Sequence, residues 1–101
     1  MTPPVVFSPE AQDDLRQLTF YIAERSGTAR ATAYLDRIEA WCFGLCDFPE
    51  RGARRDDLWP GLRTISFERR VTVAFTVASR GVTIWRLYGG RDLEAAFSES
   101  E

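Results

Sequence analysis

The chain has 101 residues, of which 45% are hydrophobic, and its formal net charge at pH 7 is −2. A domain this small already buries only a modest fraction of its surface, so the chain can form one hydrophobic core but not two. No segment approaches the roughly 20 apolar residues that span a membrane, and no basic stretch followed by an apolar run resembles an export signal. We therefore expect a single cytoplasmic domain over residues 1–101, with a core at about 4–97 and a disordered tail at 98–101.

The sequence contains no histidine, which excludes several kinds of chemistry. A Ser-His-Asp triad and an imidazole acid or base both require it. A structural zinc site needs about four ligands, usually Cys or His, whereas the chain offers only Cys42 and Cys46. Their spacing of four residues in a helical pattern is too wide for a comfortable disulfide. We expect two reduced cysteines, no metal and no cofactor.

Positive charge is concentrated in the second half of the chain. Residues 1–50 carry eight acidic and four basic side chains, whereas residues 51–92 carry four acidic and nine basic ones. Every basic residue is arginine, which suits planar, bidentate contacts to carboxylate or phosphate groups. Genome composition is the simpler explanation for the missing lysine, but the basic second half remains a candidate binding region.

The first half of the sequence predicts a short strand and two helices. Residues 4–7 have the composition of a strand, and Ser8-Pro9-Glu10 then supplies an N-cap, a proline at the first helical position and an acid in the first turn. Ser26-Gly27-Thr28 predicts the turn between the helices, and Phe48-Pro49 the end of the second. Apolar residues recur at helical spacing. The face predicted to be buried consists of Ala11, Leu15, Leu18, Ile22, Ala31, Tyr34, Leu35, Ile38, Trp41, Cys42 and Leu45.

The second half predicts an antiparallel sheet. An ordered loop between Pro49 and Gly61 precedes strands at 62–67, 71–78 and 82–88, in which apolar and polar residues alternate. The side chains expected to pack on the helices are Val71, Val73, Phe75 and Val77, whereas Thr72, Thr76 and either Thr83 or Arg86 should face outward. The predicted fold class is therefore α+β, with an N-terminal strand and a helical hairpin packed on a three- to four-stranded antiparallel sheet.

Arginines and tryptophans of the second half are the candidate binding residues. Arg63 opens a strand and Arg91 ends another, so both should project toward one surface, with a structural ion pair as the alternative role. Trp59 lies in a loop beside arginines and is a candidate interface anchor or a lid on the core, whereas we expect Trp41 and Trp85 in the core. We expect Arg51, Arg54, Arg55 and Arg80 to form a solvated surface. The predicted partner-binding set is Trp59, Arg63, Arg69, Arg70, Arg86, Tyr88 and Arg91.

Five short motifs occur in an order and at spacings that resemble the ParE branch of the RelE/ParE toxin superfamily. They are Ser8-Pro9-Glu10-Ala11 with Asp14-Leu15, Tyr21-Ile22-Ala23-Glu24-Arg25-Ser26-Gly27, Phe48-Pro49, Pro60-Gly61-Leu62-Arg63 and Tyr88-Gly89-Gly90-Arg91-Asp92. Each motif alone is weak, but the ordered set is specific and covers roughly residues 4–97. The sequence departs from the ParE pattern at Tyr88, where many relatives have histidine, and at Arg69-Arg70, where Gly-Arg is common.

The resemblance implies a toxin of a type II toxin–antitoxin system that poisons DNA gyrase. It also implies neutralisation, in a hetero-oligomer, by a cognate ParD-like antitoxin, which is a small protein with an acidic C-terminal segment. RelE-like relatives instead cut mRNA on the ribosome with basic residues and a C-terminal tyrosine. The corresponding position here is Phe97, which cannot exchange a proton. We therefore predict a gyrase inhibitor without catalytic residues.

Two alternatives stay open at this stage. A RelE-like ribonuclease would use Arg63, Arg91 and Tyr88, whose hydroxyl is close to Arg91 in sequence. The second alternative is a non-toxic module that only binds its antitoxin. In each case an arginine-lined sheet with a hydrophobic rim should attract an acidic amphipathic segment, by helix-in-groove docking or by strand addition at the sheet edge.

Overall fold

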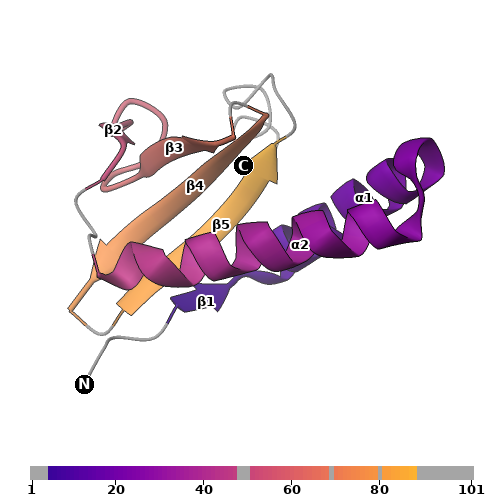
Figure 1. Cartoon of the computed structure of the whole chain (residues 1–101). Coiled ribbons are helices and arrows are strands. Elements are labelled where there is room, and N and C mark those ends of the chain that lie inside the picture. Colours follow the sequence, from indigo (N-terminus) through magenta and orange to yellow (C-terminus); the bar gives the residue numbers. More distant parts are fainter. Residues whose placement is uncertain (1–4, 48–50, 69, 80, 89–101) are drawn as a thin grey trace.

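A computed structural model of the chain describes residues 5–47, 51–68, 70–79 and 81–88. Two antiparallel helices pack on a five-stranded sheet, and the end of the hairpin where the helices join extends past the sheet (Figure 1). The elements in chain order are β1 (Val5–Phe7), α1 (Pro9–Ser26), α2 (Thr28–Phe43), the short 3-10 helix η1 (Gly44–Cys46), β2 (Ala53–Arg54), β3 (Arg63–Phe67), β4 (Val71–Ala78) and β5 (Gly81–Tyr88). No helix in these described ranges is long and apolar enough to cross a membrane.

The sheet has the strand order β1-β5-β4-β3-β2. β3, β4 and β5 form the predicted antiparallel meander, and the two-residue strand β2 extends it at one edge. At the other edge β1 pairs with β5 in parallel, with Val5 opposite Val82 and Phe7 opposite Ile84. The α+β fold class is confirmed, but the sheet has five strands rather than three or four and is mixed rather than antiparallel. Strands of two and three residues carry too little periodic pattern for the sequence to assign their pairing.

Helix α1 begins where the sequence predicts and is attached to β5 at that point. The Oγ of Ser8 accepts the N–H of Ala11 at 3.0 Å, which is the predicted N-cap bond. The same hydroxyl donates to the carbonyl of Trp85 at 2.8 Å, and the Ser8 N–H donates to the carbonyl of Ile84 at 2.9 Å. One buried serine thus caps the helix and continues the hydrogen bonds of β1 with β5.

The core lies between the helical hairpin and the sheet. Of the helical face predicted to be buried, Ala11, Leu15, Ala31, Tyr34, Ile38, Cys42 and Leu45 are buried, and Leu18, Ile22, Leu35 and Trp41 pack against them partly buried. The sheet contributes Phe67, Val71, Val73, Phe75, Val82, Ile84 and Leu87. Burial raises the pKa of the Cys42 thiol to about 12, and Glu39 adds to the shift. Cys42 is a free cysteine, as predicted.

Two expected core residues are exposed. Trp85 is 40% exposed because it directly follows the buried Ile84 on β5, and alternation along the strand places its side chain on the other face of the sheet. The pairing of β4 with β5 also shifts register there, from Phe75 opposite Ile84 to Ala74 opposite Arg86, which leaves Trp85 as an additional residue on β5. Its indole Nε1–H donates to the Thr76 hydroxyl at 2.8 Å. Val77 is also 40% exposed, near the end of β4. The predictions that these two side chains are buried were wrong.

Helix α2 ends earlier than predicted. Its last residue is Phe43, and the N–H of Gly44 still donates to the Ala40 carbonyl before the chain tightens into η1. The predicted end at Phe48-Pro49 lies outside the described residues. The following connection is held by backbone hydrogen bonds, including Arg55 N–H to Leu62 O at 2.8 Å and Leu62 N–H to Trp59 O at 3.0 Å.

Candidate functional site

The sheet register separates two of the residues predicted for a nuclease. Arg63 is opposite Phe75 on β4, which is opposite Ile84 on β5, whereas Tyr88 is opposite Thr72. Tyr88 therefore lies two strands across and three residues along from Arg63. With strands about 4.8 Å apart and about 3.4 Å per residue, their Cα atoms are roughly 14 Å apart. Arg91, the third residue of that set, lies outside the described residues, as does Arg69.

Arg86 forms an ion pair between the sheet and α1. Its Nε and Nη2 donate to the two carboxylate oxygens of Asp14 at 2.8 and 3.2 Å, and the Leu87 N–H donates to the same carboxylate at 2.9 Å. The hydrogen bond to Asp14 raises the pKa of Arg86. The guanidinium also stacks over the Tyr88 ring, with Cζ 4.8 Å from the centroid. β5 extends past the end of β1, and there the Asp14 carboxylate accepts the Leu87 N–H that a neighbouring strand could otherwise accept.

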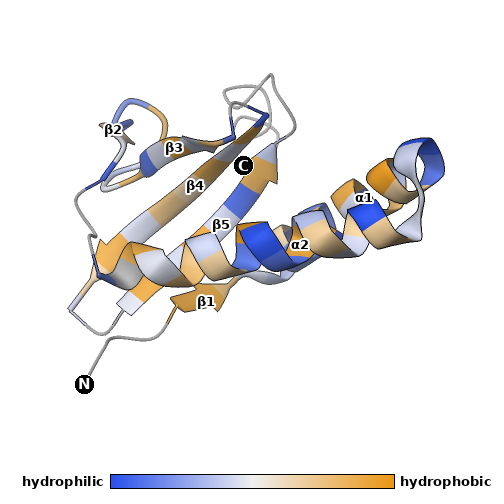
Figure 2. Ribbon diagram, viewed as in Figure 1, coloured by the Kyte–Doolittle hydropathy of each residue, from blue (hydrophilic) through white to orange (hydrophobic). Residues whose placement is uncertain are grey.

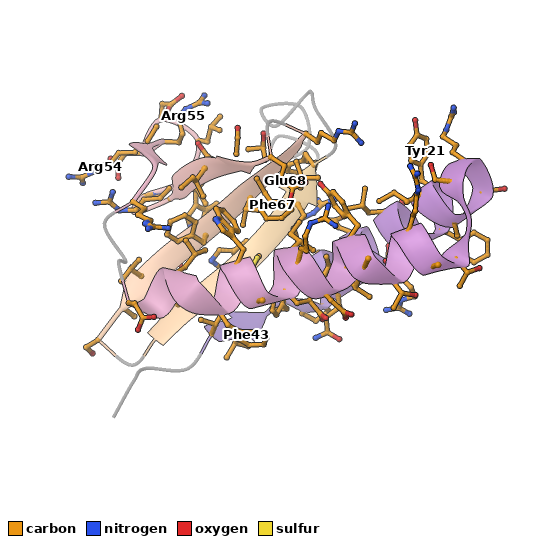
Figure 3. The ribbon with its side chains drawn as sticks, in the orientation of Figure 1. Tyr21, Phe43, Arg54, Arg55, Phe67 and Glu68 are labelled. Atoms are coloured by element: carbon orange, nitrogen blue, oxygen red, sulfur yellow. The ribbon has the colours of Figure 1, made fainter. Side chains whose placement is uncertain are left out.

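The loop before β3 presents Trp59 and two arginines to solvent. Trp59 is 52% exposed, as expected of an anchor for a partner. Arg54 pairs with Asp56 at 3.2 Å, and Arg55 forms two hydrogen bonds of 3.0 Å with Asp57. Figure 3 shows both arginines pointing away from α2.

Hydrogen bonds also lower the pKa values of two carboxyl groups in this loop. The pKa of Asp56 is lowered first by the Gly61 N–H, which donates to it at 2.9 Å, and that of Asp57 is lowered first by Arg55. The two carboxylates are therefore structural acceptors in the loop.

An apolar groove runs between β1 and the helices. It has a volume of about 910 Å³ and is lined by Val5, Phe7, Leu15, Phe20 and Leu35, with Arg16, Glu24 and Glu39 at its polar positions. Phe20 is 70% exposed and Val6 on β1 is 54% exposed. Figure 2 shows β1 hydrophobic along its whole length beside this hairpin. An open apolar surface of this kind is typical of a protein-binding site.

A second cavity, the basic pocket, lies between the hairpin and the turn that follows β3. It has a volume of about 480 Å³ and is lined by Tyr21, Arg25, Arg30, Tyr34, Arg37 and Arg70, among others. Arg37 donates to both carboxylate oxygens of Glu68, at 3.0 and 3.1 Å, and this bond lowers the pKa of Glu68. Figure 3 shows Glu68 beside Phe67 at the end of β3, and Tyr21 on α1 above α2 in the same view.

Of the predicted binding residues that the structure describes, the basic pocket contains only Arg70. Its other arginines come from the helices and were missed, although a signal for them exists. Arg30, Tyr34 and Arg37 follow the spacing i, i+4, i+7, and Tyr21 and Arg25 the spacing i, i+4, so each set shares one helical face. Within the described ranges, no three His, Cys, Asp or Glu side chains gather as a metal-ligand group.

Comparisons with known proteins place this geometry in a family. A chain of the chromosomal ParDE TA system from P. aeruginosa superposes with a TM-score of 0.76 at 22% sequence identity, covering 89% of this chain and 98% of that one. The two chains therefore share the same fold. Toxin ParE3 of Caulobacter vibrioides is 34% identical over 87 residues, which is 86% of each protein. The family model described as ParE toxin of type II toxin-antitoxin system, parDE, matches residues 5–94. The chain belongs to this ParE toxin family.

Proposed function

We propose that this ParE-family toxin inhibits DNA gyrase by binding it, catalyses no reaction, and acts in the cytoplasm until a cognate ParD-like antitoxin neutralises it. The observation that carries the proposal is the separation of Arg63 from Tyr88 by roughly 14 Å in the sheet. A ribonuclease needs an acid and a base within hydrogen-bond reach of one phosphate. Thr72 and Phe75 are three residues apart on β4, so their partners Tyr88 and Arg63 lie on opposite faces of the sheet, which favours a binding surface over an active site.

The described carboxylates support the same proposal. Asp14, Asp57 and Glu68 each accept hydrogen bonds from an arginine. The hydrogen bonds from Arg55 and Arg37 lower the pKa of Asp57 and Glu68 respectively, so both are weaker bases than an ordinary carboxylate. A general base would need its pKa raised toward neutrality. These acids hold the structure together and are poorly suited to proton transfer.

The apolar groove is the proposed docking site for the antitoxin. An amphipathic helix can insert apolar side chains between β1 and the hairpin, where Phe20 and Leu35 line the groove. Arg16 at the groove favours an acid on that helix, whereas Glu24 and Glu39 favour basic or neutral residues opposite them. We also propose that Trp59 and Arg63 contact a partner, because Trp59 is half exposed beside the strand that Arg63 begins.

The target is tested with purified toxin in a gyrase supercoiling assay that also scores trapped, cleaved DNA. The native chain and a Tyr88→Phe variant should inhibit equally, because a binding surface does not need the phenolic proton. Trp59→Ala should weaken inhibition, whereas Phe20→Ala, in the groove, should not. Absence of any effect on gyrase, including that of the host, would reject the proposal. Ribosome-dependent mRNA cleavage that disappears in Arg91→Ala would establish the ribonuclease instead.

Antitoxin docking is tested separately by titrating the toxin with the product of a neighbouring small acidic reading frame. Truncating an aromatic anchor typically costs about 2 kcal/mol, so Phe20→Ala should weaken binding roughly 30-fold. Tyr21→Ala is the matched control, because Tyr21 is the next residue on α1, is 54% exposed and does not line the groove. Equal binding by native toxin and Phe20→Ala would favour strand addition at the sheet edge over docking in the groove.

A further inference from the structure

The basic pocket carries positive charge that the fold leaves unneutralised. Arg25, Arg30, Arg37 and Arg70 line one cavity together with Tyr21 and Tyr34. Arg37 is paired with Glu68, whereas Arg25, Arg30 and Arg70 form no ion pair within the described residues. The chain as a whole has a net charge of −2, so this local excess is not a consequence of composition. Like charges held this close repel one another unless an anion lies between them.

Tyr34 supplies a second, independent feature of the pocket. The residue is only 7% exposed, and its hydroxyl has no hydrogen-bond partner among the described residues. Its ring is fixed by an edge contact with Phe67, at 5.6 Å between centroids, and by the Arg37 guanidinium, at 5.1 Å from the ring. The hydroxyl is therefore a donor that a ligand entering the pocket can satisfy. Burial raises the pKa of Tyr34, which keeps the hydroxyl protonated and able to donate.

We propose that the basic pocket binds the phosphate groups of a nucleic-acid backbone. A carboxylate offers two oxygens and is satisfied by one arginine, as Glu68 is by Arg37. Three further guanidiniums and a hydroxyl donor around one cavity instead match consecutive phosphates, each with its own charge and several acceptor oxygens. Tyr21 is 54% exposed at the mouth of the pocket, with Arg25 over one face of its ring at 4.4 Å. Its ring gives a neighbouring base a surface for stacking.

This site goes beyond the proposed function, since it predicts that the toxin touches nucleic acid directly as well as its protein target. Among the described residues, the basic pocket and the apolar groove share no lining residue. A substitution can therefore alter one of the two surfaces without changing the other. The binding experiment therefore contains neither gyrase nor antitoxin. Its failure would leave the gyrase proposal standing, and a failure of the gyrase assay would leave this one standing.

The experiment measures fluorescence anisotropy of a labelled 20-base-pair DNA duplex and a labelled 20-nucleotide RNA with the purified full chain over a range of salt concentrations. The native protein should bind with an affinity that falls steeply as salt rises. Arg30→Gln and Arg70→Gln should each weaken binding roughly fivefold or more and reduce the slope of log affinity against log salt by about one. Arg54→Gln is the control, because it removes the same charge from an exposed arginine on β2 that lines neither the pocket nor the groove. The ratio of DNA to RNA affinity identifies which backbone is preferred.

Tyr34→Phe separates binding from folding. It removes only the hydroxyl, so the free protein should be no less stable, whereas binding should weaken by roughly fivefold. Salt-insensitive or absent binding by the native chain would overturn the proposal, as would equal losses in Arg54→Gln and Arg30→Gln. Competition by inorganic phosphate or a mononucleotide as effective as that by the duplex would assign the pocket to a small phosphate ligand. Equal competition by an acidic peptide would assign it to a protein, and either result would refute a nucleic-acid site.

Discussion

The ion pair between α1 and β5 allows a sharp test of how the two halves of the chain are joined. Asp14 accepts from Arg86 Nε, Arg86 Nη2 and the Leu87 N–H, and its side chain is 11% exposed, against 26% for Arg86. Asp14→Ala would leave a backbone donor without its acceptor and a largely buried guanidinium without its counterion. We expect this single change to be among the most destabilising substitutions of a charged residue in the described chain.

The expected loss in the free energy of unfolding follows from the two groups that lose their partner, the Leu87 N–H and the Arg86 guanidinium. An unsatisfied buried N–H costs about 1–3 kcal/mol. Breaking a fully buried ion pair costs about 3–5 kcal/mol, but Arg86 retains access to water, so we assign it about 1–2 kcal/mol. The free energy of unfolding should fall by about 2–5 kcal/mol, out of about 5–15 kcal/mol for a typical domain. At about 4–8 °C per kcal/mol for a chain of this size, the Tm should fall by at least about 8 °C.

Urea unfolding followed by far-UV circular dichroism measures this change. Asp14→Asn should cost less than Asp14→Ala, because the amide oxygen still accepts the Leu87 N–H. Asp13→Ala is the matched control, because Asp13 also lies in the first turns of α1. Within the described part of the chain, its carboxylate accepts only an exposed hydrogen bond, from Gln17 Nε2 at 2.6 Å. Its cost should stay within about 0.5 kcal/mol.

A double-mutant cycle with Arg86→Met completes the test. Removing both partners eliminates the uncompensated charge, so the double variant should be less destabilised than the sum of the two single variants by about 1–2 kcal/mol. The reasoning fails if Asp14→Ala matches the native stability within about 0.5 kcal/mol, or if the two single effects simply add.

Three further predictions concern the arginine partners, the loop before β3 and the core thiol. The pKa of Glu68 lies below its ordinary value because Arg37 donates to it, so its stabilising effect is present above that value and disappears as the pH falls through the lower folded-state pKa. Glu68→Gln lacks this carboxylate, whereas the control Glu24→Gln retains it. Acidification from about pH 5 to about pH 2 should therefore lower the urea midpoint of Glu68→Gln less than that of Glu24→Gln. Gly52 has φ of +81°, and an added Cβ would approach the Thr64 carbonyl oxygen at 2.4 Å, whereas Gly61 has φ of +80° with nothing within 4 Å. Thermal unfolding should thus show Gly61→Ala losing about 1 kcal/mol and Gly52→Ala clearly more, and equal losses would contradict the clash. Cys42 is fully buried with a thiol pKa of about 12, so in a Cys46→Ser background it should react with a thiol reagent only as fast as the protein unfolds; rapid labelling of the folded protein would be inconsistent with this burial.

The sequence by itself determined the features that arise from contacts between near neighbours. Ser8 caps α1 because its hydroxyl needs only the N–H three residues on, and that bond is readable as Ser-Pro-Glu. The helical faces and the alternation in β4 follow from the geometry of one turn or one pleat. The ordered motifs were also sufficient to predict the ParE family, which the comparisons confirm.

Only the tertiary structure decided how distant segments meet. Asp14 and Arg86 are 72 residues apart, and no local pattern pairs this acid with that arginine rather than with another. The register shift at Trp85, beyond which Leu87 rather than Arg86 is buried, depends on how β4 and β5 align over their whole length. The basic pocket takes its arginines from α1, α2 and the turn after β3, although the predicted binding residues came from the sheet and its loops and none from the helices. Side-chain identity and spacing determine each element, but the packing of the hairpin on the sheet determines which charges share a cavity.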